Sequence, residues 1–127
     1  QLLKNMPDGV TCVNAIVGEY TGLVPFHYSN DFVSTTDPAF RARWEDKVDF
    51  HQVYMMQVSV DELMRSFPPP YDFVSIDTEG TSLYILGLLK PYLEGTRMIV
   101  AEDDGHQVAV EGFRRLAKTT NNIILKR

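Results

Sequence analysis

Two carboxylates, Asp77 and Glu79, directly follow the apolar stretch Phe73–Ile76 and precede Gly80. The stretch predicts a buried strand, and the apolar run after the glycine predicts a helix over Ser82–Leu89. In open α/β sheets, ligands bind at the carboxyl ends of the strands. Two carboxylates are costly to bury there without a partner. A metal ion, a substrate hydroxyl, a cofactor amine and the N-terminus of the following helix are the candidate partners.

A second acidic group follows the apolar residues 98–101, which predict a neighbouring strand. If the two strands pair in parallel, the polar residues after them meet at one edge of the sheet. Carboxylates that crowd together raise one another's pKa values, and a histidine beside them is a candidate general base. In the plainer interpretation the two carboxylates before the helix only cap it, and the histidine is a solvated loop residue. The residues expected at this edge are Asp77, Glu79, Glu102, Asp103 and His106.

The other elements are predicted from periodicity and from helix and turn signals. The alternation of helices and strands after Val60 predicts an α/β fold with a parallel sheet. Cys12 lies in an apolar run and is predicted to be a small core residue. Further strands are expected over residues 10–17, 23–28, 48–58 and 123–125. Further helices are expected over residues 38–47, from Ser59 or Asp61 to Phe67, and over residues 108–118. Residues 1–5 are expected to be the end of a helix.

Composition limits the class of protein. The 127 residues suffice for one domain, and a net charge of -5 argues against the basic surface typical of nucleic-acid binding. No apolar run reaches the length of a membrane span, and the chain does not start with a signal-peptide pattern. These features and the single cysteine predict a cytoplasmic protein without membrane or nucleic-acid partners. Gln1 at the start indicates a processed chain or a piece of a longer one.

Four segments in order resemble the FkbM-type methyltransferases, which depend on S-adenosylmethionine. The segment Asp61-Glu62-Leu63 resembles the Leu-Asp-x-Leu helix of that family, and residues 76–80 match its Ile-Asp-x-Glu-Gly strand end. Residues 14–19 with Gly22 resemble its Ala-x-Gly-Asp…Gly segment, and residues 99–102 its strand that ends in Glu. The resemblance covers roughly residues 11 to 102.

The resemblance implies methyl transfer from S-adenosylmethionine to a hydroxyl of a small molecule or sugar, without a metal. It implies that Ala15 and Ile16 lie beside the adenine, Asp77 faces the methionine end of the cofactor, and Glu79 faces the acceptor pocket. The implied fold is one α/β domain over residues 1–127, a partial Rossmann-like methyltransferase sheet, mostly parallel with helices on both faces.

The chain departs from that family in two ways. Ser82 stands where the family has a second acid. The sequence also lacks the glycine-rich loop that holds the methionine tail and the acid at the end of the second strand that holds the ribose. In the sheet of that family the first and second strands lie between the third and the fourth, so the resemblance implies that this chain lacks the middle of its sheet. A longer polypeptide, a rearranged sheet or a second chain, as in a homodimer, would then fill the gap.

Other functional classes stay open. The pair Asp77 and Glu79 also resembles the first Asp-x-Glu motif of metal-dependent 3′–5′ exonucleases, where such carboxylates hold divalent cations. A haloacid-dehalogenase phosphatase would have Asp where this chain has Glu79. The third alternative is a non-catalytic α/β domain for binding or assembly.

Overall fold

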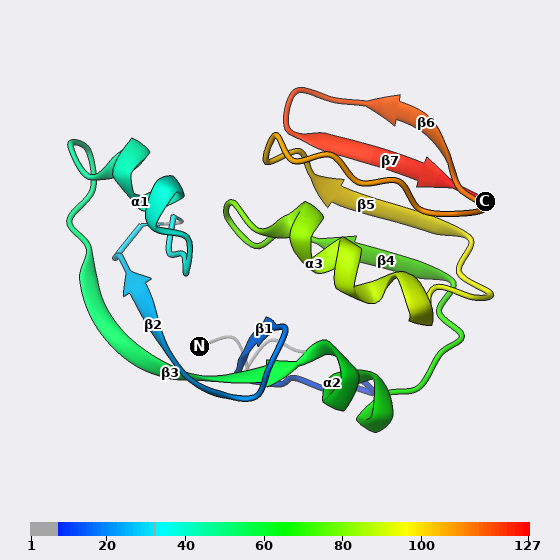
Figure 1. Ribbon diagram of the computed structural model, residues 1–127, viewed down its shortest axis with the longest axis horizontal. Coiled ribbons are helices and arrows are strands. Elements are labelled where there is room, and N and C mark those ends of the chain that lie inside the picture. The colour runs from blue at the N-terminus through cyan, green and yellow to red at the C-terminus, as the bar shows by residue number, and fades with distance from the viewer. Residues whose placement is uncertain (1–7, 32) are drawn as a thin grey trace.

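The structure is a computed structural model that describes residues 8–31 and 33–127. Its strands form two separate sheets (Figure 1). The three-stranded sheet has the order β1-β3-β2 and contains β1 (Ile16–Gly18), β2 (Gly22–Tyr28) and β3 (His51–Ser59). The four-stranded sheet has the order β4-β5-β7-β6 and contains β4 (Phe73–Ile76), β5 (Met98–Glu102), β6 (Arg114–Lys118) and β7 (Asn122–Lys126).

The helices begin where the sequence carries capping residues. The carboxylate of Asp37 accepts a hydrogen bond from the Ala39 amide (2.8 Å) at the start of α1 (Pro38–Trp44). The Ser59 hydroxyl accepts one from the Glu62 amide (3.2 Å) at the start of α2 (Val60–Ser66). Both are typical N-cap arrangements, which satisfy amides that the helix itself leaves unpaired. The helices are α1 (Pro38–Trp44), α2 (Val60–Ser66), α3 (Ser82–Leu89) and a 3-10 helix, Lys90–Tyr92.

The centre of the core lies between α3 and the four-stranded sheet. As predicted, β4 and β5 pair in parallel, with Phe73 opposite Met98 and Ile76 opposite Ala101. Leu86 of α3 and Ile99 of β5 are fully buried in this core. The carboxyl ends of β4 and β5 therefore meet at one edge of the sheet, which is where the acidic residues lie.

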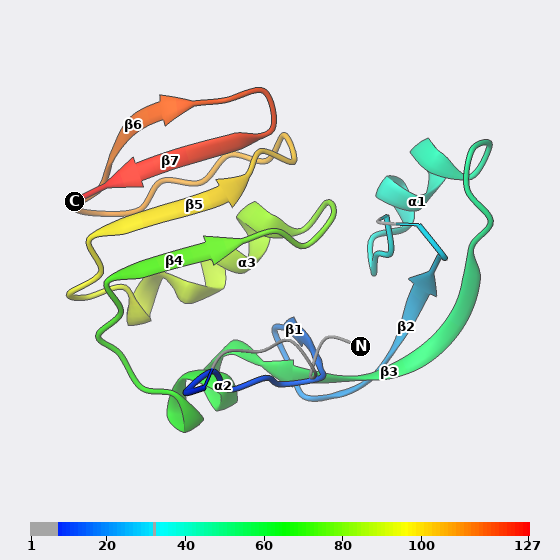
Figure 2. The same ribbon diagram turned by 180° about the vertical axis from the view of Figure 1, so that it is seen from behind.

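The predicted partial Rossmann-like sheet, mostly parallel with helices on both faces, is wrong. β7 pairs antiparallel with both β5 and β6, and β2 pairs antiparallel with β3. The connection from β6 to β7 is only a short turn, which allows a hairpin but no crossover helix. Among the described residues, α3 covers one face of the four-stranded sheet and no helix covers the other (Figure 2). β4 is an edge strand, so Phe73 is 54 % exposed instead of buried.

Two predicted elements are also wrong. The strand expected over residues 10–17 begins only at Ile16, and Cys12 is exposed instead of part of the core. The helix expected over residues 108–118 does not form, because Gly112 has a φ of 77° and the residues after it pair with β7 instead. For residues 114–118, the partner available in the tertiary structure decided against the local helical pattern. Pairing with β3 starts only at Ile16, so the apolar pattern before it forms no strand. The helix end predicted over residues 1–5 lies outside the described residues.

Within the described part of the chain, the helices are too short or too polar to cross a membrane.

Candidate functional site

The acidic turn, residues 77–81, follows β4 and has an unusual backbone. Glu79 has a φ of 46° and Gly80 a φ of 98°. The buried Thr35 hydroxyl donates to the Glu79 carbonyl oxygen (2.7 Å) and accepts from the Asp37 amide (3.0 Å). Gly80 packs against Phe40 of α1. The segment that leads into α1 thus holds the turn in a conformation that is strained for a residue with a side chain.

Three carboxylates come together at the turn. Burial raises the pKa of Glu79, and the negative charges of Glu102 and Asp77 raise it further. The Glu102 carboxylate accepts a hydrogen bond from the Ser82 hydroxyl (3.4 Å) and a long one from the Gly80 amide (3.5 Å). The predicted crowding of carboxylates at the ends of β4 and β5 is therefore confirmed for Asp77, Glu79 and Glu102.

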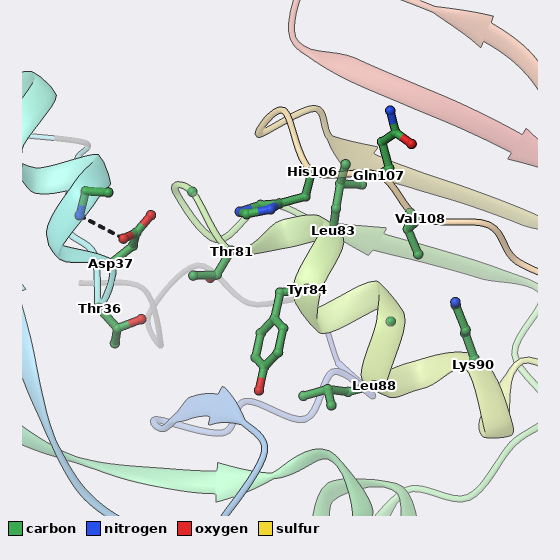
Figure 3. Close-up of a pocket in the computed structure, with 13 residues that line it drawn as sticks. Thr36, Asp37, Thr81, Leu83, Tyr84, Leu88, Lys90, His106, Gln107 and Val108 are labelled. Carbon is green, nitrogen blue, oxygen red and sulfur yellow. Dashed lines mark hydrogen bonds between the residues drawn. The ribbon is translucent and has the colours of Figure 1, made fainter.

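The other two residues expected there have contacts with other residues. Asp103 pairs with Lys118 of β6, and its hydrogen bond with the ammonium group holds the pKa of that carboxyl below its ordinary value. His106 is exposed, and its amide donates to the Asp104 carboxylate (3.2 Å). Its side chain and that of Thr81 both line one cavity (Figure 3).

The helix α3 takes its side-chain cap from elsewhere in the chain. The Asp104 carboxylate, which belongs to the loop after β5, accepts a hydrogen bond from the Leu83 amide (3.0 Å). Thr81, at the N-cap position, makes no capping bond with its side chain. Among the described residues, neither Asp77 nor Glu79 accepts a side-chain hydrogen bond from an amide of α3. The interpretation in which these two carboxylates only cap α3 is therefore not supported. Asp104 was missed in the sequence, where its only signal is the run of three acids at positions 102–104.

A cavity of about 660 Å³, here called the His106 cavity, opens on one side of the acidic turn. Its walls come from the start of α1, the turn, α3 and the loop after β5 (Figure 3). Hydroxyl, carboxylate, imidazole and ammonium groups share this lining with apolar side chains. The polar residues in the lining are Thr36, Asp37, Thr81, Tyr84, Lys90, His106 and Gln107.

A second cavity of about 560 Å³, here called the β4 cavity, contains Asp77 and Thr78 of the same turn in its lining. Most of its walls are apolar. They are formed by Thr11, Val13, Val17, Leu63, Met64, Phe67, Tyr71, Ile85 and Leu89 together with residues 73–76 of β4. The acidic turn therefore borders both of these cavities, with Asp77 and Thr78 on one and Gly80 and Thr81 on the other.

The two residues expected beside a cofactor adenine lie near the β4 cavity but not in its lining. Ile16 starts β1 and is paired with Gln57 of β3, and Ala15 precedes it. The next residue, Val17, is the one that lines the cavity.

Residues 8–31 and 33–127 contain no group of three His, Cys, Asp or Glu side chains placed to hold a metal ion. The exonuclease hypothesis, which needs Asp77 and Glu79 to act with further ligands, thus gains no support from this part of the chain.

In comparisons with known proteins, no family model, no curated protein and no solved structure matches this chain.

Proposed function

We propose that the protein takes part in methyl transfer from S-adenosylmethionine to a hydroxyl of a small molecule or sugar. The observation that carries this proposal is that the acidic turn contributes to the lining of both the β4 cavity and the His106 cavity, the second of which has more polar residues in its walls. A transfer between two bound molecules needs a donor and an acceptor held next to each other in a fixed orientation. The turn offers polar groups to both sides.

The β4 cavity suits the base and the sulfonium group of the methyl donor, S-adenosylmethionine. Its apolar walls fit an aromatic base, and the exposed Asp77 carboxylate at the end of β4 offers a negative charge to a cationic ligand. S-adenosylmethionine carries such a base and a sulfonium sulfur, and supplies a methyl group that passes to an oxygen while the sulfur keeps the electron pair of the broken bond. Ala15 and Ile16, beside Val17 in the chain, are the candidates to contact the adenine.

The His106 cavity suits the acceptor. Threonine, tyrosine and glutamine side chains can hydrogen-bond to hydroxyl groups, and Asp37 and Lys90 add opposite charges. The acceptor hydroxyl must lose a proton during the transfer. His106 lines this cavity and is one candidate base. Glu79, which belongs to the turn but lines neither cavity, is the other, because its raised pKa makes it a stronger base than an ordinary carboxylate.

The remaining parts of the proposal concern the setting. We place the protein in the cytoplasm, with a small molecule or sugar as acceptor, either as part of a longer chain or as a homodimer. The net charge of -5 favours a partner other than nucleic acid.

The test is transfer of a labelled methyl group from S-adenosylmethionine at millimolar concentration to a panel of sugars and other hydroxyl compounds. Asp77→Asn keeps the shape of the side chain and removes its charge. We expect the rate to fall by roughly 10²–10⁴-fold, the range for a positioned acid or base. The free energy of unfolding should change by only about 1 kcal/mol, since Asp77 is exposed.

Asp72→Asn, which removes an exposed carboxylate just before β4, is the matched control and should keep the wild-type rate. EDTA should not affect transfer. Full activity of Asp77→Asn would remove this residue from the mechanism. Phosphodiester hydrolysis that EDTA abolishes would favour the exonuclease instead. If neither wild type nor Asp77→Asn transfers methyl groups, and the substitution changes the free energy of unfolding, the interpretation as a binding or assembly domain would be favoured.

A further inference from the structure

A small cavity lies between the β4 cavity and the His106 cavity. It has a volume of about 110 Å³ and is here called the junction cavity. Val17 and Ile85 line both it and the β4 cavity. Thr36, Thr81 and Tyr84 line both it and the His106 cavity. The junction cavity is therefore where the contents of the two larger cavities can come closest to each other.

A carboxylate and a phenol from different elements meet in the wall of the junction cavity. Glu19 follows β1, and Tyr84 belongs to α3. The Tyr84 hydroxyl donates a hydrogen bond to Oε2 of Glu19 (2.9 Å). Burial raises the pKa of Tyr84, and the bond to Glu19 raises it further, so the phenol keeps its proton and stays the donor. Within the described part of the chain, no hydrogen bond or ion pair engages Oε1 of Glu19. This oxygen can accept a hydrogen bond from a ligand.

The backbone on both sides of Glu19 is held by one buried side chain. Gln57 of β3 is 8 % exposed, and its side-chain amide donates to the Tyr20 carbonyl oxygen (2.8 Å). The same side chain packs so closely on Gly18 that a Cβ atom there would overlap with it. The Glu19 carboxylate therefore extends from a fixed backbone, which favours the defined position that a group acting on a reacting atom needs.

The two bases considered above do not line the junction cavity. His106 lines the larger cavity named after it, and Glu79 lines none of the three. Glu19 is the one carboxylate in the described lining of the junction cavity. A general base must lie within hydrogen-bond reach of the proton that it removes. For a hydroxyl group that reacts between the two larger cavities, Glu19 meets this condition.

The volume of the junction cavity limits which hydroxyl group can enter it. About 110 Å³ is the space of roughly three to four water molecules. A hydroxymethyl group, which projects from its molecule on a CH₂ link, fits such a space. A sugar ring with its hydroxyl groups is larger and must stay in the His106 cavity. Secondary hydroxyl groups sit directly on the ring and do not reach as far.

We propose that the junction cavity binds a primary hydroxyl group of the acceptor, and that Glu19 accepts first its hydrogen bond and then its proton. This assignment rests on the proposed methyl transfer and names its substrate class, a primary alcohol. The hydroxyl oxygen forms a bond to the methyl carbon while the bond from this carbon to sulfur breaks, and the sulfur keeps the electron pair. The proton passes to Oε1 of Glu19, a residue that is exposed and can release it to water.

The first test measures binding without S-adenosylmethionine. The probes are 1-propanol and 2-propanol, which contain the same atoms but differ in the class of hydroxyl. NMR signals of the Val17 and Ile85 methyl groups report on the junction cavity, and those of Leu89 on the β4 cavity. We expect 1-propanol to shift the first two saturably and not the third, and 2-propanol to bind at least tenfold more weakly. Glu19→Ala should weaken binding of 1-propanol at least tenfold, because a hydrogen bond to a charged group is lost.

Glu94→Ala is the matched control for this test. It removes an exposed carboxylate that lines none of these three cavities, and it should bind 1-propanol as wild type does. The absence of saturable shifts, equal shifts at Leu89, equal affinities for the two alcohols or unchanged binding by Glu19→Ala would overturn the assignment. These outcomes do not depend on whether the protein transfers methyl groups.

The second test uses the transfer assay with its panel of sugars and other hydroxyl compounds. We expect NMR spectra of the products to show methyl ethers at primary hydroxyl groups. Glu19→Ala should lower the rate by roughly 10²–10⁴-fold. Sodium formate, but not sodium chloride, should restore part of this rate, a rescue that a merely structural role of Glu19 would not give.

The outcomes of the second test separate the two proposals. Equal transfer to secondary hydroxyl groups, or full activity of Glu19→Ala, would refute the assignment of the junction cavity and leave methyl transfer itself standing. No transfer by wild type would refute methyl transfer and with it the role of Glu19 as a base.

Discussion

Gly80 lies directly against Phe40: a Cβ atom at position 80 would be 2.7 Å from Phe40 Cδ2. Phe40 is buried, and Gly80 has a φ of 98°. This contact connects α1 to the acidic turn, although 40 positions separate the two residues in the sequence. The position of Asp77 and Glu79 thus depends on a helix that contributes no carboxylate to the turn.

Replacement of Gly80 by alanine should destabilise the protein strongly. The Cβ would overlap with a buried ring, and the positive φ is strained for alanine, so we expect a loss of about 2 kcal/mol or more in the free energy of unfolding. Gly105→Ala is the matched control, because Gly105 has a φ of 88° but nothing within 4 Å of the position that a Cβ would occupy. It should lose only about 1 kcal/mol. Equal losses in urea unfolding would show that the contact with Phe40 contributes nothing.

Removal of the Thr35 hydroxyl should loosen the acidic turn. Thr35→Val keeps the size of the side chain but leaves the Glu79 carbonyl and the Asp37 amide without their bonds to it. An unpaired buried polar group costs about 1–3 kcal/mol, so a decrease in that range is expected. Thr35→Ser keeps the hydroxyl and should recover most of this loss. Thermal unfolding of both variants measures the decrease in stability. A valine variant as stable as wild type would contradict the role of the hydroxyl.

Asp104 should stabilise α3 through its bond to the Leu83 amide. Asp104→Ala should lower the free energy of unfolding by about 1 kcal/mol, a typical value for the loss of a cap. Asp104→Asn keeps an oxygen acceptor and should lose less. Far-ultraviolet circular dichroism during urea unfolding provides the measurement. If the alanine and asparagine variants were equally stable, the capping bond would not be the source of the effect.

The pKa of Glu79 predicts a pH dependence of stability. Burial and neighbouring carboxylates raise this pKa above its ordinary value of 4.5 in the folded protein. The folded state therefore binds this proton more tightly than the unfolded state does. The resulting stabilisation is complete below the unfolded pKa and is lost as the pH rises through the folded pKa.

Glu79→Gln should remove the loss of stability that ionisation of Glu79 causes as the pH rises. Relative to wild type, the variant should gain stability as the pH rises from 4.5 toward neutrality, by up to about 1 kcal/mol because the site is only partly shielded from solvent. Urea unfolding at several pH values checks this. The exposed Glu94→Gln variant controls for the change in net charge. A difference between wild type and Glu79→Gln that shrinks as the pH rises would contradict the prediction.

Binding of S-adenosylmethionine to the 127-residue chain should be weak. These residues contain no glycine-rich loop before a helix, and such a loop would supply the backbone amides for the polar tail of the ligand. Isothermal titration calorimetry should show no binding at micromolar concentrations. A micromolar dissociation constant would prove this expectation wrong and would indicate that other residues bind the tail.

Local patterns determined several elements. Capping residues and apolar periodicity predicted α1, α2 and α3, and the continuous apolar runs predicted β4, β5 and their parallel pairing. The carboxylates Asp77, Glu79 and Glu102 could be expected together for the same reason, since the first two follow β4 and Glu102 ends β5. Such features depend on residues close in sequence and on one pairing, so the sequence is sufficient to predict them.

Only the tertiary structure decided how the strands are divided between sheets and what surrounds the acidic turn. Residues 108–118 have a helical pattern, yet Arg114–Lys118 form β6 because β7 offers them a partner. Thr35 and Phe40 reach the turn from a distant segment, and Asp104 caps a helix that precedes it in the chain. These contacts join residues whose local sequence carries no sign of their partner, and the choice of partner depends on which groups the whole chain leaves unpaired.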